Sequence, residues 1–339
     1  MSKFYPLTVS SVRHETRDAV VLTLDVPAEH KEAFRFQQGQ YLTFRTEIDG
    51  EEVRRCYSIC AAVQDSHLRV GIKKIADGRF SSWANEKIAA GDVLDVMPPM
   101  GSFFVPLDPA NEKHYVAFAG GSGITPVLGI IKTTLLTEPN SSFTLFYGNR
   151  ASSTIMFREE LEDIKNNNLG RFQLVHILER ERQDVELFNG ILNREKCELL
   201  LKYWVNASDI DTAFICGPEA MMLQAAEALQ AAGLDKRQMT ARRFFTRYMD
   251  FVHRIVARYH PARVIALYPL YILAVYALAV GWICAESRRY PSWPRRLAAL
   301  ASLLAMAPLL ALASAVDTLA ARREVLPTSS AVDPRSARL

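Results

Sequence analysis

The hydrophobic positions in the first 105 residues form short runs, some of which alternate with polar positions. Turn sequences such as Asp49-Gly50, Asp77-Gly78 and Gly91-Asp92 separate the runs, a spacing typical of small antiparallel barrels. The expected strands are Leu7-Val9, Ala19-Leu24, Tyr41-Arg45, Arg54-Ile59, Leu68-Ile75 and Val93-Val96. We therefore predict an antiparallel β-barrel over residues 1–108, with a polar, proline-containing linker at residues 106–114.

From Tyr115 onward, apolar runs alternate with segments of helical periodicity. Continuous apolar runs indicate strands buried on both faces, and their alternation with helices is typical of a parallel sheet. The runs are YVAFA (115–119), FTLFY (143–147), FQLVHIL (172–178) and TAFIC (212–216). This pattern predicts an α/β domain over residues 109–243.

Two long apolar stretches follow: residues 264–285 are 22 residues without a charge, and residues 297–316 are 20. At ~1.5 Å per residue, a helix of either length crosses the ~30 Å hydrocarbon core of a bilayer. We predict an α-helical hydrophobic tail over residues 244–339 and interpret it as a transmembrane hairpin, with two buried helices of a water-soluble fold as the alternative. Arginines flank the first helix on both sides, so the positive-inside rule does not orient it.

The net charge of +3 hides an uneven distribution. The last 99 residues carry fourteen Arg and five acidic residues, whereas residues 1–240 carry 26 basic and 32 acidic residues. Lys, Asn and Gln also disappear near residue 241, which indicates a boundary at residues 240–250. The part before it has no basic patch interleaved with aromatic residues, so we expect no nucleic-acid partner.

The cysteines bear on the cellular compartment. They are Cys56, Cys60, Cys197, Cys216 and Cys284, an odd number without the spacing of a disulfide framework. The stretch MSKFYPLTVSSVRHE also lacks the apolar core of a signal peptide. Both features favour a reducing compartment, so we expect a cytoplasmic catalytic part, anchored to a membrane if residues 264–316 span one.

The stretch AFAGGSGITPVLGII joins a buried strand to a helix through three glycines. Gly120, Gly121 and Gly123 allow the backbone to approach a diphosphate. The helix that Thr125 and Pro126 open supplies N–H groups and the positive end of its dipole. A tight turn without a ligand would need one glycine rather than three, so the motif indicates a nucleotide phosphate site.

The last predicted strand ends in FICGPEAMM, and ligands of open parallel sheets bind outside the carboxyl ends of the strands. Cys216, Gly217 and Pro218 occupy that position. An ordinary helix start, with Pro218 in the first turn and Glu219 near the positive end of the dipole, explains the same residues and is compatible with a ligand site. We expect the small, polarisable thiol of Cys216 to lie beside a bound nicotinamide.

The segment RRCYSIC contains two cysteines and a candidate cofactor clamp. On a strand, Cys56 and Cys60 would lie ~13 Å apart at about 3.3 Å per residue, which argues against a disulfide and against a zinc site. Alternation places Arg55 and Tyr57 on the opposite face, where a guanidinium suits phosphate oxygens and a ring suits stacking on a flat heterocycle. We therefore interpret the segment as a cofactor clamp and predict no metal site.

The motifs Arg55-x-Tyr57-Ser58, GGSGITP, YGNR and CGPEAMM, in this order, resemble the ferredoxin–NADP reductase superfamily. Residues 1–246 are similar to the family of reductase subunits of phenylacetyl-CoA (ring 1,2-) epoxidase complexes, in stretches that include SVRHETRDAV, RFQQGQYLTF, EEVRRCYSIC and MFREEL. The resemblance implies a barrel that binds FAD and an α/β domain that binds NADPH or NADH.

The resemblance also implies roles for individual residues. Arg55 would hold the FAD diphosphate, Tyr57 would stack on the isoalloxazine, and Ser58 would form a hydrogen bond near flavin N5. The segment Gly78-Arg79-Phe80-Ser81-Ser82 would add contacts to the diphosphate, and Gly120 to Pro126 would hold the nucleotide phosphates. Hydride would pass from the nicotinamide to the flavin, and electrons would then leave singly.

Two further assignments are implied, and the coenzyme remains to be chosen. Cys216 and Glu219 would lie near the nicotinamide, and Phe244 would cover the other face of the flavin. A typical NAD site has an acid after the second strand, whereas Tyr147 is followed by Gly-Asn and Arg150. Arg150 suits a 2′-phosphate, so we expect NADPH, with a solvated loop arginine as the alternative.

The chain departs from the resemblance after Thr246. Such reductases continue into a plant-type ferredoxin domain whose four cysteines hold a [2Fe–2S] cluster, whereas only Cys284 follows here. We therefore expect electrons to pass to oxygenase subunits or to an external ferredoxin-like acceptor. The alternative is a natural or artificial join, in which the reductase fold persists as a membrane-anchored protein without physiological electron transfer.

Overall fold

The computed structural model of the protein describes residues 3–241, which belong to one compact unit. Four predictions fall outside these residues, namely those for Phe244, Cys284 and the apolar stretches 264–285 and 297–316. Between residues 3 and 241, no helix combines the length and the apolar character that a membrane span requires.

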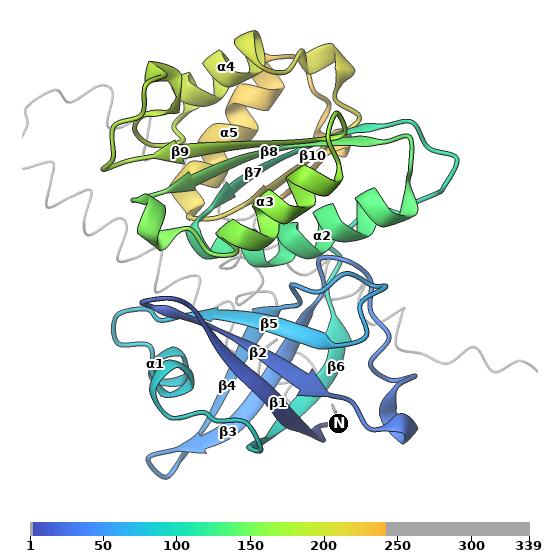
Figure 1. Cartoon of the computed structure of the whole chain (residues 1–339), viewed down its shortest axis with the longest axis vertical. Coiled ribbons are helices and arrows are strands. Elements are labelled where there is room, and N and C mark those ends of the chain that lie inside the picture. Colours follow the sequence, from blue (N-terminus) through green and yellow to red (C-terminus); the bar gives the residue numbers. More distant parts are fainter. Residues whose placement is uncertain (1–2, 242–339) are drawn as a thin grey trace, which may run out of the picture. The chain divides into compact units, whose positions relative to one another are not determined.

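The first part of the chain is a six-stranded antiparallel sheet in the order β4-β3-β6-β1-β2-β5 (Figure 1). Its strands are β1 (Tyr5–Thr16), β2 (Ala19–Asp25), β3 (Tyr41–Ile48), β4 (Glu51–Ser58), β5 (Leu68–Lys73) and β6 (Val93–Met100). Ile59, directly after β4, pairs with Val70 on β5 and so joins the two edges of the sheet. One helix, α1 (Arg79–Glu86), follows β5. The prediction of an N-terminal antiparallel sheet is confirmed.

The second sheet has five parallel strands in the order β11-β10-β7-β8-β9. They are β7 (His114–Gly120), β8 (Ser142–Asn149), β9 (Phe172–Leu178), β10 (Thr212–Cys216) and β11 (Met239–Ala241). The helices α2 (Ile124–Thr137) and α3 (Arg158–Asn167) cover one face, and α4 (Arg194–Tyr203) and α5 (Glu219–Ala231) cover the other (Figure 1). Short 3-10 turns are η1 (Ala28–His30), η2 (Gly121–Gly123), η3 (Ser152–Thr154), η4 (Glu186–Phe188), η5 (Ala207–Asp209) and η6 (Lys236–Gln238). The predicted parallel sheet is confirmed.

Alternate side chains of the central strand β7 enter two different cores. Tyr115, Ala117 and Ala119 pack with residues of α2 and α3, whereas Val116 and Phe118 pack with residues of α4 and α5. Successive residues of a strand point to opposite faces, so a strand with a core on each face has to be apolar throughout. This explains the uninterrupted run YVAFA.

The core beneath α2 and α3 continues into the antiparallel sheet. The buried residues that the N-terminal part contributes to it are Ala19, Val21, Cys60 and Phe103. Gly71 on β5 permits this close approach, because a Cβ atom there would lie 2.9 Å from Thr125 Cγ2 and 3.1 Å from Phe157 Cζ. The two parts therefore share one hydrophobic core.

Glu15 on β1 also stabilises the start of α3. Phe157, the residue before the helix, has a φ of +59°, a left-handed conformation that is uncommon for a side chain other than glycine. Its N–H donates a hydrogen bond to Glu15 Oε1 at 2.7 Å, and Arg13 pairs with the same carboxylate at 2.6 Å. The contact satisfies an N–H group at a helix end from a residue 142 positions away in the chain.

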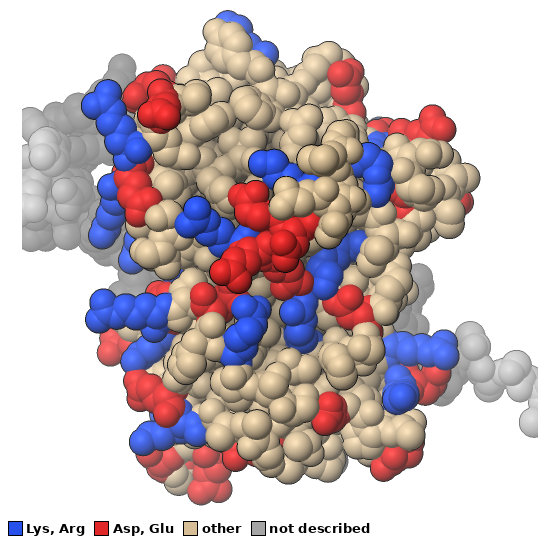
Figure 2. All heavy atoms as spheres, viewed as in Figure 1, with Lys and Arg blue, Asp and Glu red and all other residues tan. Residues whose placement is uncertain are grey.

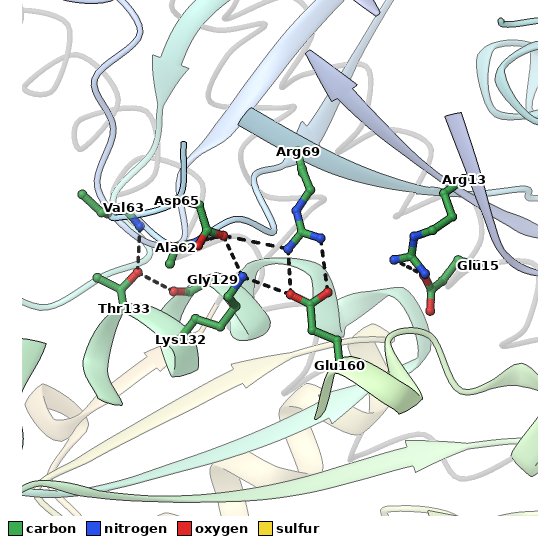
Figure 3. A network of polar contacts seen from close by, with 10 residues as sticks. All are labelled: Arg13, Glu15, Ala62, Val63, Asp65, Arg69, Gly129, Lys132, Thr133 and Glu160. Atoms are coloured by element: carbon green, nitrogen blue, oxygen red, sulfur yellow. Dashed lines mark hydrogen bonds and ion pairs between the residues drawn. The ribbon is translucent and has the colours of Figure 1, made fainter. Parts of the chain in front are cut away.

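Four charged side chains form a cluster at the rim of the shared core (Figure 3). Glu160 on α3 accepts hydrogen bonds from Arg69 on β5 at 2.7 Å and from Lys132 on α2 at 3.0 Å. Lys132 also contacts Asp65, in the loop before β5, at 2.6 Å. Burial raises the pKa of Glu160, but the hydrogen bonds and charges of the two cations outweigh it and lower that pKa overall. In the view of Figure 2, acidic and basic side chains lie close together in the middle of the surface.

Candidate functional site

The glycine motif forms the turn between β7 and α2, as predicted. Strand β7 ends at Gly120, the segment Gly121–Gly123 makes a 3-10 turn, and α2 begins at Ile124. Pro126 therefore lies in the first helical turn, where its missing N–H costs no hydrogen bond. A buried strand leads through glycines directly into the N-terminus of a helix, which is the arrangement that favours phosphate binding.

Hydrogen bonds from both sides hold this turn. The Tyr147 hydroxyl on β8 donates to the carbonyl of Gly121 at 3.0 Å, and the Thr125 hydroxyl donates to the carbonyl of Ser122 at 3.0 Å. Gly121 has a φ of +51°, and a Cβ atom there would meet no described atom within 4 Å. The turn is fixed on its inner side and open beside Gly121.

The second motif forms the turn between β10 and α5. Strand β10 ends at Cys216, Gly217 and Pro218 follow, and α5 begins at Glu219. Cys216 is fully buried, whereas Glu219 is exposed in the first turn of the helix. The carboxylate of Glu219 lies at the positive end of the helix dipole, where an acid is stabilised.

The two turns pack against each other backbone to backbone. A Cβ atom at Gly123 would lie 2.1 Å from the carbonyl oxygen of Cys216, and one at Gly217 would lie 3.0 Å from the amide nitrogen of Gly120. A Cβ at Gly120 would lie 2.9 Å from Cδ of Pro218. Any larger residue would push the two turns apart, so the glycines allow the two turns to pack in direct contact.

Both turns lie where the strand order of the parallel sheet reverses. Strand β7 has β8 on one side and β10 on the other, and the chain leaves both β7 and β10 at their carboxyl ends. Nucleotides bind at this switch point in open parallel sheets. The structure thus brings the GGSGITP and CGPEAMM motifs together at the expected location.

The clamp residues lie at the end of β4. Arg55 is exposed; its guanidinium donates to the carbonyl of Arg54 at 2.7 Å and forms no ion pair within residues 3–241. Tyr57 is half-buried and Ser58 is buried. Burial raises the pKa of Tyr57 and the charge of Arg55 only partly offsets this, so the hydroxyl stays protonated and remains a donor.

The segment Gly78 to Ser82 lies against this clamp. Phe80 on α1 packs against Tyr57 with ring centroids 5.4 Å apart. The Ser81 hydroxyl donates to the carbonyl of Gly78 at 3.1 Å and accepts from the N–H of Ile75 at 3.3 Å, so it holds the turn before α1. The Ser82 side chain is half-buried next to it. The motifs RRCYSIC and GRFSS are therefore brought together by aromatic packing.

The two cysteines of RRCYSIC lie in different surroundings. Cys56 is exposed on β4, with its sulfur 3.3 Å from the Thr43 hydroxyl, whereas Cys60 is buried in the shared core beyond the end of the strand. Both are free thiols. Burial raises the pKa of Cys60 to about 12, so this thiol stays protonated and unreactive.

Sequence reasoning missed an acid near the predicted coenzyme site. Arg150 follows the end of β8 and is exposed, as a residue that meets a phosphate would be. Glu181, in the loop after β9, accepts hydrogen bonds from the N–H and the hydroxyl of Ser152, at 3.0 and 3.1 Å. Glu181 follows β9, the neighbour of β8 in the parallel sheet, so the two strands end at the same edge although the acid is distant from Arg150 in the sequence.

These residues fit a flavin and a nicotinamide nucleotide. An arginine without an ion pair inside residues 3–241 lies two residues from a half-buried tyrosine ring, which suits a diphosphate next to a flat heterocycle. The glycine turn is open beside Gly121 at the N-terminus of α2, which suits a second diphosphate.

Comparison with known proteins agrees with this geometry. The sequence profile of the family "Oxidoreductase FAD-binding domain" matches residues 6–105, and that of the family "Oxidoreductase NAD-binding domain" matches residues 118–227. Over 246 residues the chain is 46% identical to a component of the 1,2-phenylacetyl-CoA epoxidase of Escherichia coli, a match that spans 73% of this chain and 69% of that protein. The chain belongs to the ferredoxin reductase family.

Other members of the family match the same part of the chain. The ferredoxin reductase component of 3-ketosteroid-9-alpha-monooxygenase from Rhodococcus rhodochrous is 32% identical, over 70% of this chain and 64% of that protein. A ferredoxin NADP+ reductase from Neisseria gonorrhoeae, solved with FAD and NADP, has a TM-score of 0.59 at 20% identity, over 71% of this chain and 99% of that one. At that identity the likeness shows the fold alone.

Family membership establishes the general chemistry of the ferredoxin reductase chain. It is an oxidoreductase with an FAD-binding and a NAD-binding domain, which transfers electrons between a nicotinamide nucleotide and FAD. Membership of this family therefore favours an active oxidoreductase over the alternative, a chain that keeps the reductase fold without physiological electron transfer.

Proposed function

We propose that this protein is the reductase component of a multicomponent oxygenase, and that its oxygenase partner is of the phenylacetyl-CoA epoxidase type. The observation that carries the proposal is the 46% identity to the Escherichia coli epoxidase component, which extends over both the FAD-binding and the NAD-binding region. A second relative is the ferredoxin reductase component of a monooxygenase, which supports the wider class. NADPH is the proposed reductant.

In this proposal the antiparallel sheet holds FAD. Arg55 binds the diphosphate with its exposed guanidinium, and Gly78 and Ser82 bring the backbone and a hydroxyl of the α1 turn to the same phosphates. Ser81 shapes that turn through its hydrogen bond to Gly78. Tyr57 supports the flavin ring, because packing on Phe80 limits the motion of its own ring.

The parallel sheet holds the nicotinamide nucleotide. Gly120, Gly121 and Gly123 cradle its diphosphate at the N-terminus of α2, whose first turn contains Thr125 and Pro126. The nicotinamide lies against the β10 turn, formed by Cys216, Gly217 and Pro218, with Glu219 at the start of α5. Arg150 meets the 2′-phosphate.

Bound FAD would accept two electrons as a hydride and release them one at a time. The chain's own residues bind and orient the reactants. Ser58, at the end of β4, would place its hydroxyl beside the reacting position of the flavin, and Cys216, at the end of β10, belongs to the turn assigned to the nicotinamide. Cys216 is fully buried. Its thiol can therefore contact a nicotinamide only if the turn after β10 moves when the ligand binds.

The proposed acceptor is an oxygenase component or a separate ferredoxin-like protein. The names of the relatives place them among the components of oxygenases, which supports a protein acceptor. We also propose that the catalytic part works in the cytoplasm, where reduced nicotinamide nucleotides are formed. Association with a membrane would depend on residues 264–316.

The test uses the purified full-length chain with its bound flavin. The expected result is a yellow protein that NADPH bleaches without oxygen and that reduces ferricyanide with NADPH. Ser58→Ala should slow flavin reduction at saturating NADPH about 100-fold, the usual effect of losing a group that acts in proton or hydride transfer, while nucleotide affinity changes little. Ser10→Ala, an exposed serine on β1, is the control. A colourless protein, or a flavin that ignores both NADPH and NADH, would contradict the proposal.

A further inference from the structure

The loop after β8 carries a serine whose donors are both occupied by an acid. Glu181 Oε2 accepts from the Ser152 N–H at 3.0 Å, and Glu181 Oε1 accepts from the Ser152 hydroxyl at 3.1 Å. Two hydrogen bonds to one residue hold the carboxylate in a fixed orientation. No ion pair neutralises Glu181 within residues 3–241, although Arg150 and Arg180 lie in the same two loops.

Backbone hydrogen bonds just beyond β8 and β9 set the position of both loops. The N–H of Glu179 donates to the carbonyl of Asn149 at 3.0 Å, and the N–H of Arg180 donates to the carbonyl of Arg150 at 2.8 Å. These bonds continue the β8–β9 ladder beyond the strands. Glu181 follows Arg180 directly, so the sheet itself brings its carboxylate to Ser152.

In the proposed function, this position corresponds to the adenosine end of the nucleotide site. Gly148 on β8 pairs with Gly120 on β7, directly before the glycine turn that receives the diphosphate. In sheets of this kind, the residues beyond the neighbouring strand read the ribose of the adenosine: an acid binds its 2′-hydroxyl, and an arginine accommodates a 2′-phosphate. Here Arg150 and Glu181 both occupy that region.

We propose that Glu181, held by Ser152, is the residue that discriminates against the 2′-phosphate of NADPH, and that Arg150 acts in the opposite sense. The inference rests on the proposed function, because it assigns the nucleotide to the glycine turn. The carboxylate repels a phosphate dianion, and it occupies the N–H and hydroxyl of Ser152 that a phosphate would otherwise use. The balance between Glu181 and Arg150 sets the ratio of NADPH to NADH use.

The first test measures binding without catalysis. Adenosine 2′,5′-bisphosphate and 5′-AMP differ by the 2′-phosphate alone, and calorimetric titration of the flavin-loaded full-length protein gives a dissociation constant for each. Glu181→Gln keeps the size of the side chain and one acceptor for Ser152. It should raise affinity for the bisphosphate relative to 5′-AMP about tenfold, or ~1.4 kcal/mol. Adding Arg150→Gln to that variant should reverse most of the gain.

The second test is the ratio of kcat/KM for NADPH to that for NADH in flavin reduction, which should rise about tenfold in Glu181→Gln. Glu179→Gln is the matched control, because this exposed carboxylate lies two residues away in the same loop and does not contact Ser152. An equal rise in the control would reduce the effect to general charge and overturn the inference. An unchanged ratio, with both coenzymes still active, would overturn the inference and leave the proposed function standing. Failure of both coenzymes to reduce the wild-type flavin would overturn both.

Discussion

Replacing Glu160 with Gln removes one negative charge from the cluster of Arg69, Lys132, Asp65 and Glu160 while it keeps the shape of the side chain. In the wild type, Glu160 contacts Arg69 at 2.7 Å and Lys132 at 3.0 Å. After the change, Asp65 alone faces two cations, at 3.9 Å from Arg69 and 2.6 Å from Lys132. The cluster then carries an uncompensated positive charge between the two parts of the molecule.

The size of the effect follows from the exposure of these groups. Exposed ion pairs contribute about 0–1 kcal/mol, whereas removing one partner of a buried pair costs about 3–5 kcal/mol. The Glu160 and Arg69 side chains are 22% and 20% exposed, which lies between those limits but nearer the buried one. We expect Glu160→Gln to lower the free energy of unfolding by about 2 kcal/mol, or the melting temperature by about 4–8 °C.

Urea unfolding, followed by circular dichroism at pH 7, measures this loss. Glu159→Gln is the control: it lies in the same first turn of α3 and is exposed, so it shares the helix-dipole effect but not the contacts. The lowered pKa of Glu160 means that its contribution is complete above the ordinary carboxyl pKa and is lost as pH falls through the lowered value. The gap between wild type and Glu160→Gln should therefore close in acid. Equal destabilisation by both substitutions, or a gap that widens in acid, would refute the reasoning.

Three further predictions concern other parts of the fold. Gly71→Ala should cost about 1–3 kcal/mol in urea unfolding, because its Cβ would lie 2.9 Å from Thr125 Cγ2 across the shared core. Glu138→Ala should cost about 3 kcal/mol, since the buried carboxylate accepts four hydrogen bonds, including those from Tyr115 and Asn111. Burial raises the pKa of Glu138, but these bonds outweigh it and lower that pKa, so acid should destabilise wild type more than Glu138→Gln. Cys56→Ser should remove one fast-reacting thiol in titration with a disulfide reagent, whereas the buried Cys60 should react only after unfolding.

The parallel sheet was predictable because its central strands have a core on each face. Runs such as FTLFY are short and rich in aromatic and β-branched residues, which favours a buried strand over a helix. Strand β11 was missed because it has three residues, Met239–Ala241, and none of them forms an apolar run. Its pairing with β10 supplies the structure that its own sequence does not specify. Strand β1 likewise extends to Thr16, far beyond Leu7-Val9, because β2 pairs with it along its length.

Part of the candidate site was predictable from the sequence and part was not. The glycine turn and the β10 turn were predictable, since each motif follows a recognisable strand and opens a helix. Contacts between distant segments were not: nothing in the sequence near Ser152 points to Glu181, and nothing near Phe157 points to Glu15. Such pairs depend on how strands lie side by side in three dimensions, which hydrophobic periodicity does not encode.

The shared core has a consequence for how this chain relates to longer ones. Because Ala19, Val21, Cys60 and Phe103 are buried against the parallel sheet, cutting the chain after residue 108 would expose apolar surface on both fragments. Each part therefore depends on the other for the burial of this surface, and we expect neither to fold alone as stably as it does in the whole chain. The interface between the two sheets is therefore part of the folded core of residues 3–241 and not a contact between two independent domains.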